Sequence, residues 1–318
     1  MSEALTCVVT GAAGFIGSHV VDHLLRAGHR VVGLDCFTDY YPRTVKEQNL
    51  AAARAHPGFT LVEADLREAD LVALLAGADV VVHEAAMGGL LRSWTWFEEY
   101  LTCNVLATQR LLEAVREAGV GHLVHASTSS VYGRDSSGDE DRPTRPDSPY
   151  GVTKLAAENL VRAYGSNFDL PVTVLRYYSI YGPRQRPDMG YHVFIDRILQ
   201  GEPITVFGDG LQTRGNTFVD DCVAATLAAV EHGPTGEVYN IGGGERISAL
   251  GVVRLLEEII GREARVIYGP PRPGEQQSAF ADTAKARREL GWAPRTGIHD
   301  GLRAQVAWQE AALAGAAP

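Results

Sequence analysis

Short runs of β-branched and other apolar residues alternate with longer amphipathic stretches through the first half of the chain. Each run is continuously apolar, which is typical of a strand buried on both faces of a parallel sheet. The stretches at 15–28 and 98–119 repeat apolar residues at helical spacing, and a sixth run follows a helix that begins near Tyr150. The predicted strands are 5–10, 30–35, 59–65, 79–85, 122–128 and 171–177. This alternation predicts an α/β fold with a Rossmann-type, doubly wound parallel sheet.

The composition of the chain changes after the sixth predicted strand. Segments rich in Pro, Arg and Gly occur at 179–190, 208–216 and 268–277, too far apart to form one linker. We interpret them as parts of a smaller C-terminal, substrate-binding lobe that lies over the strand ends of the first domain. The expected division is a dinucleotide-binding domain over 1–178, to which 217–245 returns, and a lobe made of 179–216 and 246–318.

Composition narrows the class of protein. The chain has 318 residues and a formal charge of −10, which argues against a nucleic-acid binder. No apolar run has the length of a membrane span, and the first residues lead directly into a strand rather than into a signal peptide. The cysteines are widely separated, so we expect reduced thiols in a cytoplasmic protein and no metal site. They are Cys7, Cys36, Cys103 and Cys222.

A glycine triplet joins the first predicted strand to the first predicted helix. Gly11, Gly14 and Gly17 stand three residues apart, and glycine there allows a diphosphate to approach the amides at the start of the helix. Asp35 ends the second strand 18 residues after Gly17, near the usual spacing of about 20 for an acid that binds the adenosine ribose. A carboxylate there repels a 2′-phosphate, so the pattern predicts NAD rather than NADP.

Further residues are expected around the same cofactor. Asp65 closes the third strand and either reaches the adenine or caps the helix that begins at Leu66. The remaining predicted contacts lie at the glycine turn and at the ends of the third and fourth strands; they are Phe15, Ile16, Leu66, Ala85 and Ala86. Tyr150 and Lys154 are also expected to contact the cofactor.

Tyr150 and Lys154 are four residues apart on a predicted helix and therefore share one face. A free phenol has a pKa of about 10, too high for a base at neutral pH. A lysine one turn away, together with a positive nicotinamide ring, favours the phenolate. Tyr150 can then remove the proton of a sugar hydroxyl while hydride leaves the same carbon. The spacing alone is common, and the pair gains weight because it follows a dinucleotide-binding pattern.

These motifs together resemble those of the extended short-chain dehydrogenase/reductases. More narrowly, the chain resembles the nucleotide-sugar 4-epimerases, dehydratases and decarboxylases, and it is closest to the UDP-glucuronate 4-epimerases. The resemblance extends from Thr6 to about Trp308. It implies NAD as a resident cofactor, a Rossmann domain with a small substrate lobe, and a homodimer that pairs the helices around 100–118 and 150–168.

The resemblance assigns a catalytic hydroxyl to Thr128, which would bind the sugar 4-oxygen opposite Tyr150. The next two positions separate the reactions of the family. The 4,6-dehydratases carry Asp-Glu there, and the glucuronate decarboxylases commonly carry Glu at the second position. Ser129 and Ser130 supply neither acid and resemble the glucuronate epimerases, in which small hydroxyls can hold a substrate carboxylate. Alternatively, both serines bond only to local backbone.

Other substrate contacts also come from the resemblance, and two stretches depart from it. The match places Ser179 beside the substrate and gives phosphate- or carboxylate-binding roles to three arginines, Arg186, Arg214 and Arg272. Leu91 occupies the place of an arginine usual in the epimerases, and Arg92 is displaced by one residue. Gly215 and Asn216 stand where Asp-Phe is usual.

The sequence therefore predicts an NAD-dependent nucleotide-sugar 4-epimerase that acts on a UDP-linked sugar through a transient 4-keto intermediate. The favoured substrate is UDP-glucuronate. A 4-epimerase of UDP-glucose and UDP-galactose fits the absence of arginine at Leu91. A UDP-glucuronate decarboxylase is disfavoured by Ser130. A catalytically silent NAD- or sugar-binding protein is disfavoured by the presence of Thr128, Tyr150 and Lys154.

Overall fold

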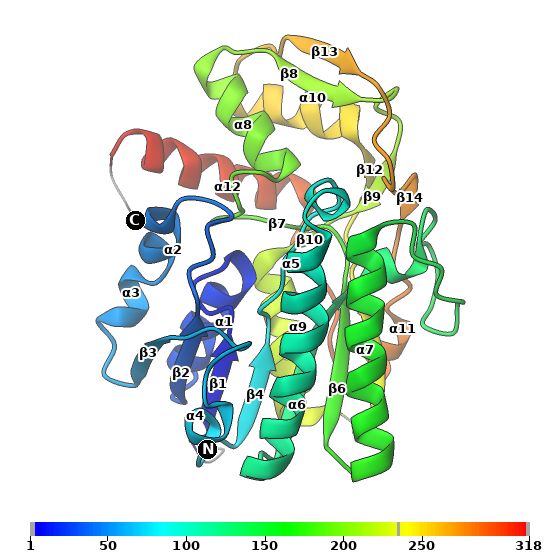
Figure 1. The fold of residues 1–318 in the computed structure, drawn as a ribbon. Helices are drawn as coiled ribbons and strands as arrows, with labels where there is room; N and C mark the ends of the chain where they lie inside the picture. The colour runs from blue at the N-terminus through cyan, green and yellow to red at the C-terminus, as the bar shows by residue number, and fades with distance from the viewer. Residues whose placement is uncertain (1–3, 234–235, 316–318) are drawn as a thin grey trace.

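The computed structural model describes residues 4–233 and 236–315 and is built around one sheet of seven parallel strands (Figure 1). The strand order is β11-β6-β5-β4-β1-β2-β3, so the chain reverses its direction of winding between β1 and β4. The strands are β1 (Thr6–Thr10), β2 (Arg30–Asp35), β3 (Phe59–Glu63), β4 (Val80–His83), β5 (His122–Thr128), β6 (Val172–Tyr177) and β11 (Glu237–Ile241). Every strand predicted from the sequence is present, with ends that differ by at most two residues.

Helices cover both faces of this sheet, as a doubly wound fold requires. On one face α1 (Phe15–Arg26) packs against α9 (Val219–His232), and on the other α6 (Ala107–Ala118) lies between α4 (Leu71–Leu75) and α7 (Pro149–Phe168). Each face has its own apolar core, because alternate side chains of each strand point to opposite sides. Two short helices, α2 (Arg43–Asn49) and α3 (Ala51–Arg54), lead from β2 to β3.

The stretch predicted as one helix over 98–119 is interrupted. It consists of α5 (Phe97–Leu101), a π-helical turn over Thr102–Leu106, and α6. Asn104 in that turn is buried, and its amide bonds to both backbone groups of Met87 and to the Thr153 hydroxyl. These bonds hold Asn104 in the widened turn. Turns of this kind are frequent at functional sites. Apolar periodicity cannot detect such a turn.

The smaller lobe lies above the strand ends in Figure 1 and is built from short elements. Its helices are α8 (Gly190–Gln200), α10 (Ala249–Ile260) and α12 (Ile298–Leu313), which pack together, while α11 (Ala284–Glu289) packs against β11 of the large sheet. Its strands form a parallel pair, β8 (Ile204–Phe207) with β13 (Val266–Gly269), and a three-stranded sheet, β12 (Arg246–Ser248), β9 (Thr213–Gly215) and β14 (Ser278–Ala279). The pair β7 (Ile180–Tyr181) and β10 (Thr217–Phe218) connects the lobe with the large sheet.

The lobe faces the carboxyl ends of the parallel strands at the point where the strand order reverses, which is where open α/β sheets bind ligands. Among the described residues, no helix is long and apolar enough to cross a membrane.

His83 and His125 lie side by side on β4 and β5, with ring centroids 5.2 Å apart. His83 is buried between the hydroxyls of Thr10 and Thr108, at 2.7 and 3.0 Å. Burial lowers the pKa of His83 to about 3 and that of His125 well below its ordinary value. Both rings are therefore neutral in the folded protein.

We predict that this pair makes folding stability fall as the pH falls. Between pH 6.5, the ordinary histidine pKa, and about pH 3, His83 is protonated in the unfolded chain but neutral in the folded protein. Acid in this range therefore stabilises the unfolded state relative to the folded state. Urea unfolding measured from pH 7.5 to pH 5 should show a weaker pH dependence in His83→Gln than in the unchanged protein. His232→Gln, at an exposed histidine at the end of α9, is the control and should keep the original slope. Equal slopes in all three proteins would contradict the assignment.

Candidate active site

A cavity of about 640 Å³ opens along the carboxyl edge of the sheet, between the two parts of the chain. Its wall contains every residue proposed from the sequence except Lys154. These residues are Gly11, Gly14, Phe15, Ile16, Gly17, Asp35, Asp65, Leu66, Ala85, Ala86, Thr128, Ser129, Ser130, Tyr150, Ser179, Arg186, Arg214 and Arg272. Lys154 lies behind the wall, 4% exposed, and its ammonium group donates to the Ala126 carbonyl at 2.6 Å.

The glycine turn has the geometry that a diphosphate requires. A Cβ on Gly17 would lie 2.2 Å from the Gly11 oxygen, and one on Gly11, whose φ is +68°, would lie 2.8 Å from the Ala85 nitrogen. Gly14 caps α1 without a side-chain hydrogen bond, so the amides at the start of that helix remain available to an anion. The turn therefore fits the diphosphate of a dinucleotide.

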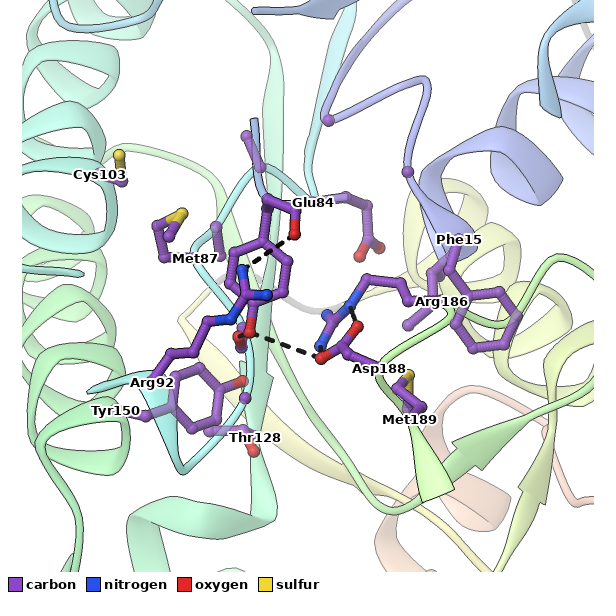
Figure 2. A pocket seen from close by; sticks show the side chains of 18 of the residues that line it. Phe15, Glu84, Met87, Arg92, Cys103, Thr128, Tyr150, Arg186, Asp188 and Met189 are labelled. Carbon is purple, nitrogen blue, oxygen red and sulfur yellow. Dashed lines mark hydrogen bonds and ion pairs between the residues drawn. The ribbon is translucent and has the colours of Figure 1, made fainter. Parts of the chain in front are cut away.

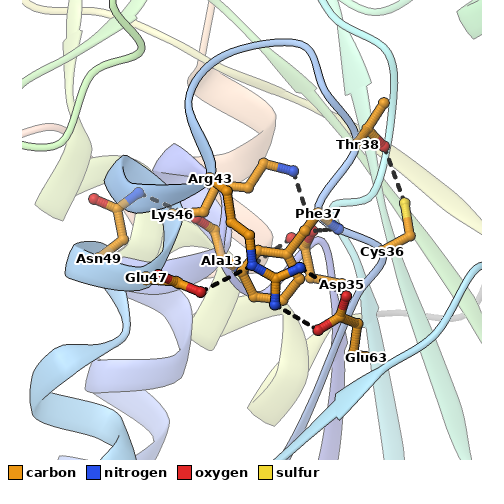
Figure 3. A network of polar contacts seen from close by, with 10 residues as sticks. All are labelled: Ala13, Asp35, Cys36, Phe37, Thr38, Arg43, Lys46, Glu47, Asn49 and Glu63. Carbon is orange, nitrogen blue, oxygen red and sulfur yellow. Dashed lines mark hydrogen bonds and ion pairs between the residues drawn. The ribbon is translucent and has the colours of Figure 1, made fainter.

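Asp35 is held in a buried polar network at the end of β2 (Figure 3). Its carboxylate accepts hydrogen bonds from the backbone amides of Ala13, at 3.1 Å, and Phe37, at 2.8 Å. Lys46 from α2 adds an ion pair at 3.1 Å, with both side chains less than a tenth exposed. Because the carboxylate still lines the cavity, it can also accept from a ribose hydroxyl. Sequence spacing gave no indication of Lys46, which lies 11 residues after the acid it pairs with.

Asp65 forms a forked ion pair with Arg67 rather than remaining free. Its two oxygens accept from the Arg67 side chain, and one of them also accepts from the Arg67 amide. Hydrogen bonding to Arg67 lowers the pKa of Asp65. The carboxylate thus stays ionised at the wall of the cavity.

Tyr150 and Thr128 lie next to each other at the wall of the cavity (Figure 2). Burial raises the pKa of Tyr150, and its hydrogen bond with the Thr128 hydroxyl opposes that rise. Burial also lowers the pKa of Lys154 to about 8, while the carboxylates of Glu84 and Glu158 oppose that change. A buried phenol and a buried ammonium group one helical turn apart form a proton-transfer site that depends on nearby charge.

The four consecutive hydroxyls at the end of β5 and in the turn that follows it have four different environments. Ser127 donates to Glu158 at 2.7 Å, an interior bond away from the reaction. Thr128 accepts from the Ser130 amide at 3.1 Å, and the Ser129 hydroxyl lies 3.4 Å from Gln276 of the small lobe. Within the described chain, the Ser130 hydroxyl has no recorded protein partner. Ser130 is therefore the hydroxyl of this group that is most available to a ligand.

The three arginines differ in how far their charge is already compensated. Arg186 is clamped by both oxygens of Asp188, at 2.9 and 3.1 Å (Figure 2). Arg214 lies 3.8 Å from Glu275, and Arg272 stacks on Phe207 with 3.4 Å between its guanidinium carbon and the ring centre. Burial lowers the pKa values of Arg214 and Arg272, which favours the approach of an anion.

Ser179 has a φ of +44°, in the left-handed region that few side chains adopt. It lines the cavity, and its carbonyl accepts from the Thr217 amide at 3.3 Å. Strained backbone of this kind is concentrated at functional sites.

The departure at Leu91 and Arg92 has a structural explanation. Leu91 precedes a short 3₁₀ turn over Arg92–Trp94 and is 45% exposed at the edge of the cavity. The Arg92 guanidinium lies over the Tyr40 ring, 4.2 Å from its centre, and donates to the Tyr40 carbonyl at 2.9 Å. Tyr40 donates to the carbonyl of Gly88, a residue whose missing side chain admits Arg186. Arg92 thus adds positive charge to the cavity by a different route.

The departure at Gly215 and Asn216 is also a local rearrangement. A Cβ on Gly215 would lie 2.7 Å from the Phe280 ring, so glycine makes room for that side chain. Asn216 accepts from the Tyr191 hydroxyl at 2.8 Å. Tyr191 and Asn216 line a second cavity of about 490 Å³, which shares Ser179, Arg214 and Arg272 with the first.

Sequence reasoning missed several residues of the site. The most prominent ones reach the cavity by tertiary packing and carry no spacing signal; they are Tyr40, Lys46, Glu84, Tyr177, Asp188 and Gln276. Asp188 stands two residues after Arg186, and an acid so close to a candidate anion-binding arginine was the one available hint.

The chain has many relatives. Residues 7–242 match the model of the NAD dependent epimerase/dehydratase family. YtcB of Bacillus subtilis (strain 168), an uncharacterized UDP-glucose epimerase, is 44% identical over 306 residues, 95% of this chain and 96% of its own. The UDP-glucuronate 4-epimerase of Thermodesulfobacterium geofontis (strain OPF15) is 36% identical over 310 residues, 95% of both chains.

A solved structure gives the same result in three dimensions. The UDP-glucuronic acid 4-epimerase of Bacillus cereus, crystallised with UDP-glucuronic acid and NAD, has a TM-score of 0.94 and 43% identity. The match covers 96% of this chain and 99% of that chain. These comparisons confirm the predicted fold class and the resemblance stated from the motifs.

We predict that removing the Lys46 charge weakens the fold more than removing an exposed charge from the same helix. Lys46→Met leaves Asp35 buried without its ion-pair partner, a change that costs about 3–5 kcal/mol in comparable buried pairs. Arg43→Met, in which the lost ion pairs are with Glu47 and Glu63 at the surface, is the matched control and should cost much less. Denaturant titration without added NAD measures both. Similar losses in the two variants would show that the Asp35–Lys46 pair is not a stabilising element.

Proposed function

The chain belongs to the NAD dependent epimerase/dehydratase family, and from that premise we propose that it is a UDP-glucuronate 4-epimerase, which interconverts UDP-glucuronate and UDP-galacturonate. The family is NAD-dependent, and the glycine turn and Asp35 fit that cofactor. The expectations of an enzyme and of NAD as its cofactor are therefore confirmed.

The residues at the end of β5 and on α7 would carry the chemistry. Tyr150 would accept the proton of the sugar 4-hydroxyl and later return it, while Thr128 would orient the 4-oxygen between them. Lys154 would supply the positive charge that makes the Tyr150 phenolate accessible despite burial. The glycine turn and Asp35 would hold the dinucleotide. When bound, NAD would take hydride from C4 and return it to the opposite face of the ring.

The observation that carries the proposal is the set of hydroxyls opposite Tyr150. Thr128 and Tyr150 would assist the oxidation at C4 by binding the 4-oxygen and taking its proton, but Ser129 and Ser130 contain no acid–base group that could remove water. The Ser130 hydroxyl lies at the cavity wall without a partner among the described residues, and Arg92 adds positive charge. A cavity of this kind supports binding of a sugar carboxylate that must be held still, because a 4-keto acid loses CO₂ readily.

A second candidate is a 4-epimerase of UDP-glucose and UDP-galactose. It is favoured by Leu91, an exposed apolar side chain where a carboxylate-binding arginine is usual, and by the clamping of Arg186 by Asp188. In this reading the serines would bond to a neutral 6-hydroxyl.

The same proposal assigns a different ligand to each part of the chain. The large domain, with α9 and β11 returning to it, would bind NAD, and the lobe of 179–216 and 246–318 would bind the nucleotide diphosphate through Ser179, Arg214 and Arg272. We also place the protein in the cytoplasm, where nucleotide sugars are made and used.

We further propose a homodimer through α5, α6 and α7. Large apolar side chains on these helices and on the π-helical turn between α5 and α6 are 43–49% exposed, although their neighbours are buried. They are Phe97, Leu101, Leu106, Val152 and Phe168. An apolar face of this kind is typical of an interface between subunits.

The primary test is incubation of the purified protein with UDP-glucuronate and, separately, with UDP-glucose, followed by mass spectrometry and NMR. An unchanged mass with inverted C4 from UDP-glucuronate is the expected result. Loss of about 44 mass units, the mass of CO₂, would instead identify a decarboxylase, and loss of the mass of water would identify a dehydratase. Inversion of UDP-glucose alone would support the second candidate.

Tyr150→Phe should lower kcat by at least about 100-fold, the scale of general acid–base catalysis, and should leave bound NAD in place. Bound NAD is measured after denaturation of the purified variant. Tyr164→Phe, on the same helix but outside the cavity, is the control. Full activity of Tyr150→Phe would overturn the assigned mechanism.

Leu106→Glu should convert the dimer into monomers, because it places a charge on the apolar face. Sedimentation velocity measures the change. Leu211→Glu, at a 64% exposed leucine of the small lobe, is the matched control and should remain dimeric. A monomeric unchanged protein would contradict the proposed interface.

A further inference from the structure

Glu84 is a charged group of the cavity that the mechanism above does not use. It follows the last residue of β4, and its carboxylate accepts a hydrogen bond from the Tyr177 hydroxyl at 2.8 Å. The Tyr177 hydroxyl lies 2.8 Å from that of Thr226 on α9, which fixes the ring from the other side. The acid is therefore held in place at the wall of the cavity that Thr128 and Tyr150 also line (Figure 2).

The position of Glu84 follows from the sheet order. The glycine turn follows β1 and would hold the diphosphate, and Thr128 ends β5, beside Tyr150. Because β4 lies between β1 and β5, a dinucleotide that joins these two places passes the end of β4. The half that extends toward Tyr150 is the nicotinamide half, since hydride transfer takes place there. Glu84 thus lies along the path of the nicotinamide.

Groups from three neighbouring elements act on the Glu84 carboxylate. Lys154 and Tyr150 from α7, Tyr177 from β6 and Cys222 from α9 interact with it electrostatically. Lys154 is the one cation among these groups, and Glu84 is the first of the two acids that oppose its deprotonation. In a cavity that excludes water, such a charge acts over several ångströms.

We propose that Glu84 is a positioning residue whose carboxylate stabilises the positive charge of Lys154 and of the oxidised nicotinamide, and thereby biases bound cofactor toward NAD over NADH. The nicotinamide ring is positive before it accepts hydride and neutral afterwards, so a fixed negative charge favours the oxidised form. In the proposed epimerase, on which this inference rests, the bias favours return of hydride to the sugar and keeps the 4-keto intermediate short-lived.

The charge of Glu84 changes within the working pH range. Burial raises the pKa of Glu84 to about 7, against the opposing effects of Tyr177 and Lys154. Above this pH the carboxylate is charged and the bias toward NAD is present. As the pH falls through about 7 the group is protonated, and the bias should weaken.

The test measures which form of the cofactor the protein prefers, without any sugar. The protein is equilibrated with equal concentrations of NAD and NADH and separated from free nucleotide, and the bound ratio is read from the absorbance of the reduced nicotinamide. Glu84→Gln keeps the size and an oxygen acceptor for Tyr177 but removes the charge. It should shift the ratio toward NADH by roughly fivefold to tenfold, the scale expected for one partly screened charge. Glu84→Asp should retain most of the preference for NAD.

Glu140→Gln is the matched control, because it removes a half-buried carboxylate that lies outside the cavity and accepts from the Asn240 amide. It should leave the bound ratio unchanged. The unchanged protein should bind relatively more NADH at pH 6 than at pH 8, and this dependence should be weaker in Glu84→Gln, in which only Lys154 of the pair still titrates. A Glu84→Gln protein with the original ratio and pH dependence would overturn the inference.

The two proposals fail separately. If the unchanged protein epimerises no UDP-sugar, the proposed function is wrong, but the bound ratio still tests the charge effect of Glu84. If epimerisation is found and the ratio does not respond to Glu84→Gln, only the inference about Glu84 is wrong.

Discussion

The cost of removing charge from water decides which side chains of this cavity remain available to a ligand. An isolated buried ion is unstable, so each charged group at the wall must be compensated by the protein or by what binds there. Asp35 is compensated by Lys46 and two backbone amides, and Arg186 by Asp188. Arg272 has a ring rather than an acid beneath it. The uncompensated positive charge therefore lies toward the small lobe, where an anionic diphosphate would be bound.

Much of the large domain could be predicted because its constraints are local. A buried parallel strand has to be continuously apolar, and the glycine turn has to be free of side chains where Gly17 contacts Gly11. The π-turn at Asn104 could not be predicted in this way. It depends on the amide of one side chain meeting Met87 and Thr153, which are distant in sequence.

The site was partly predictable for the same reason. Residues that follow strand ends, such as Asp35 and Thr128, must share one edge of the sheet, so their convergence follows from the fold. Tyr40, Glu84 and Asp188 depend on how loops cross that edge, and their roles became visible only in three dimensions. The structure also shows what spacing could not: the Lys154 ammonium group donates to the Ala126 carbonyl.

The small lobe contacts the large domain at Ser129, one of the residues that distinguish the reactions of the family. Gln276 of the small lobe donates to the carbonyls of Ser129 and Gly133, both at 3.1 Å, and lies against the Ser129 hydroxyl. This fixes the turn after β5 in relation to the lobe that would hold the nucleotide. A sugar tethered by its diphosphate could then rotate while the turn keeps Thr128 and Ser130 in place. Because Ser129 already contacts Gln276, the carboxylate of a uronic acid would have to be held by Ser130 together with the positive charge of Arg92. Placing the carboxylate with those groups, rather than leaving it free to align with the 4-keto carbon, is how this cavity can epimerise the sugar without losing CO₂.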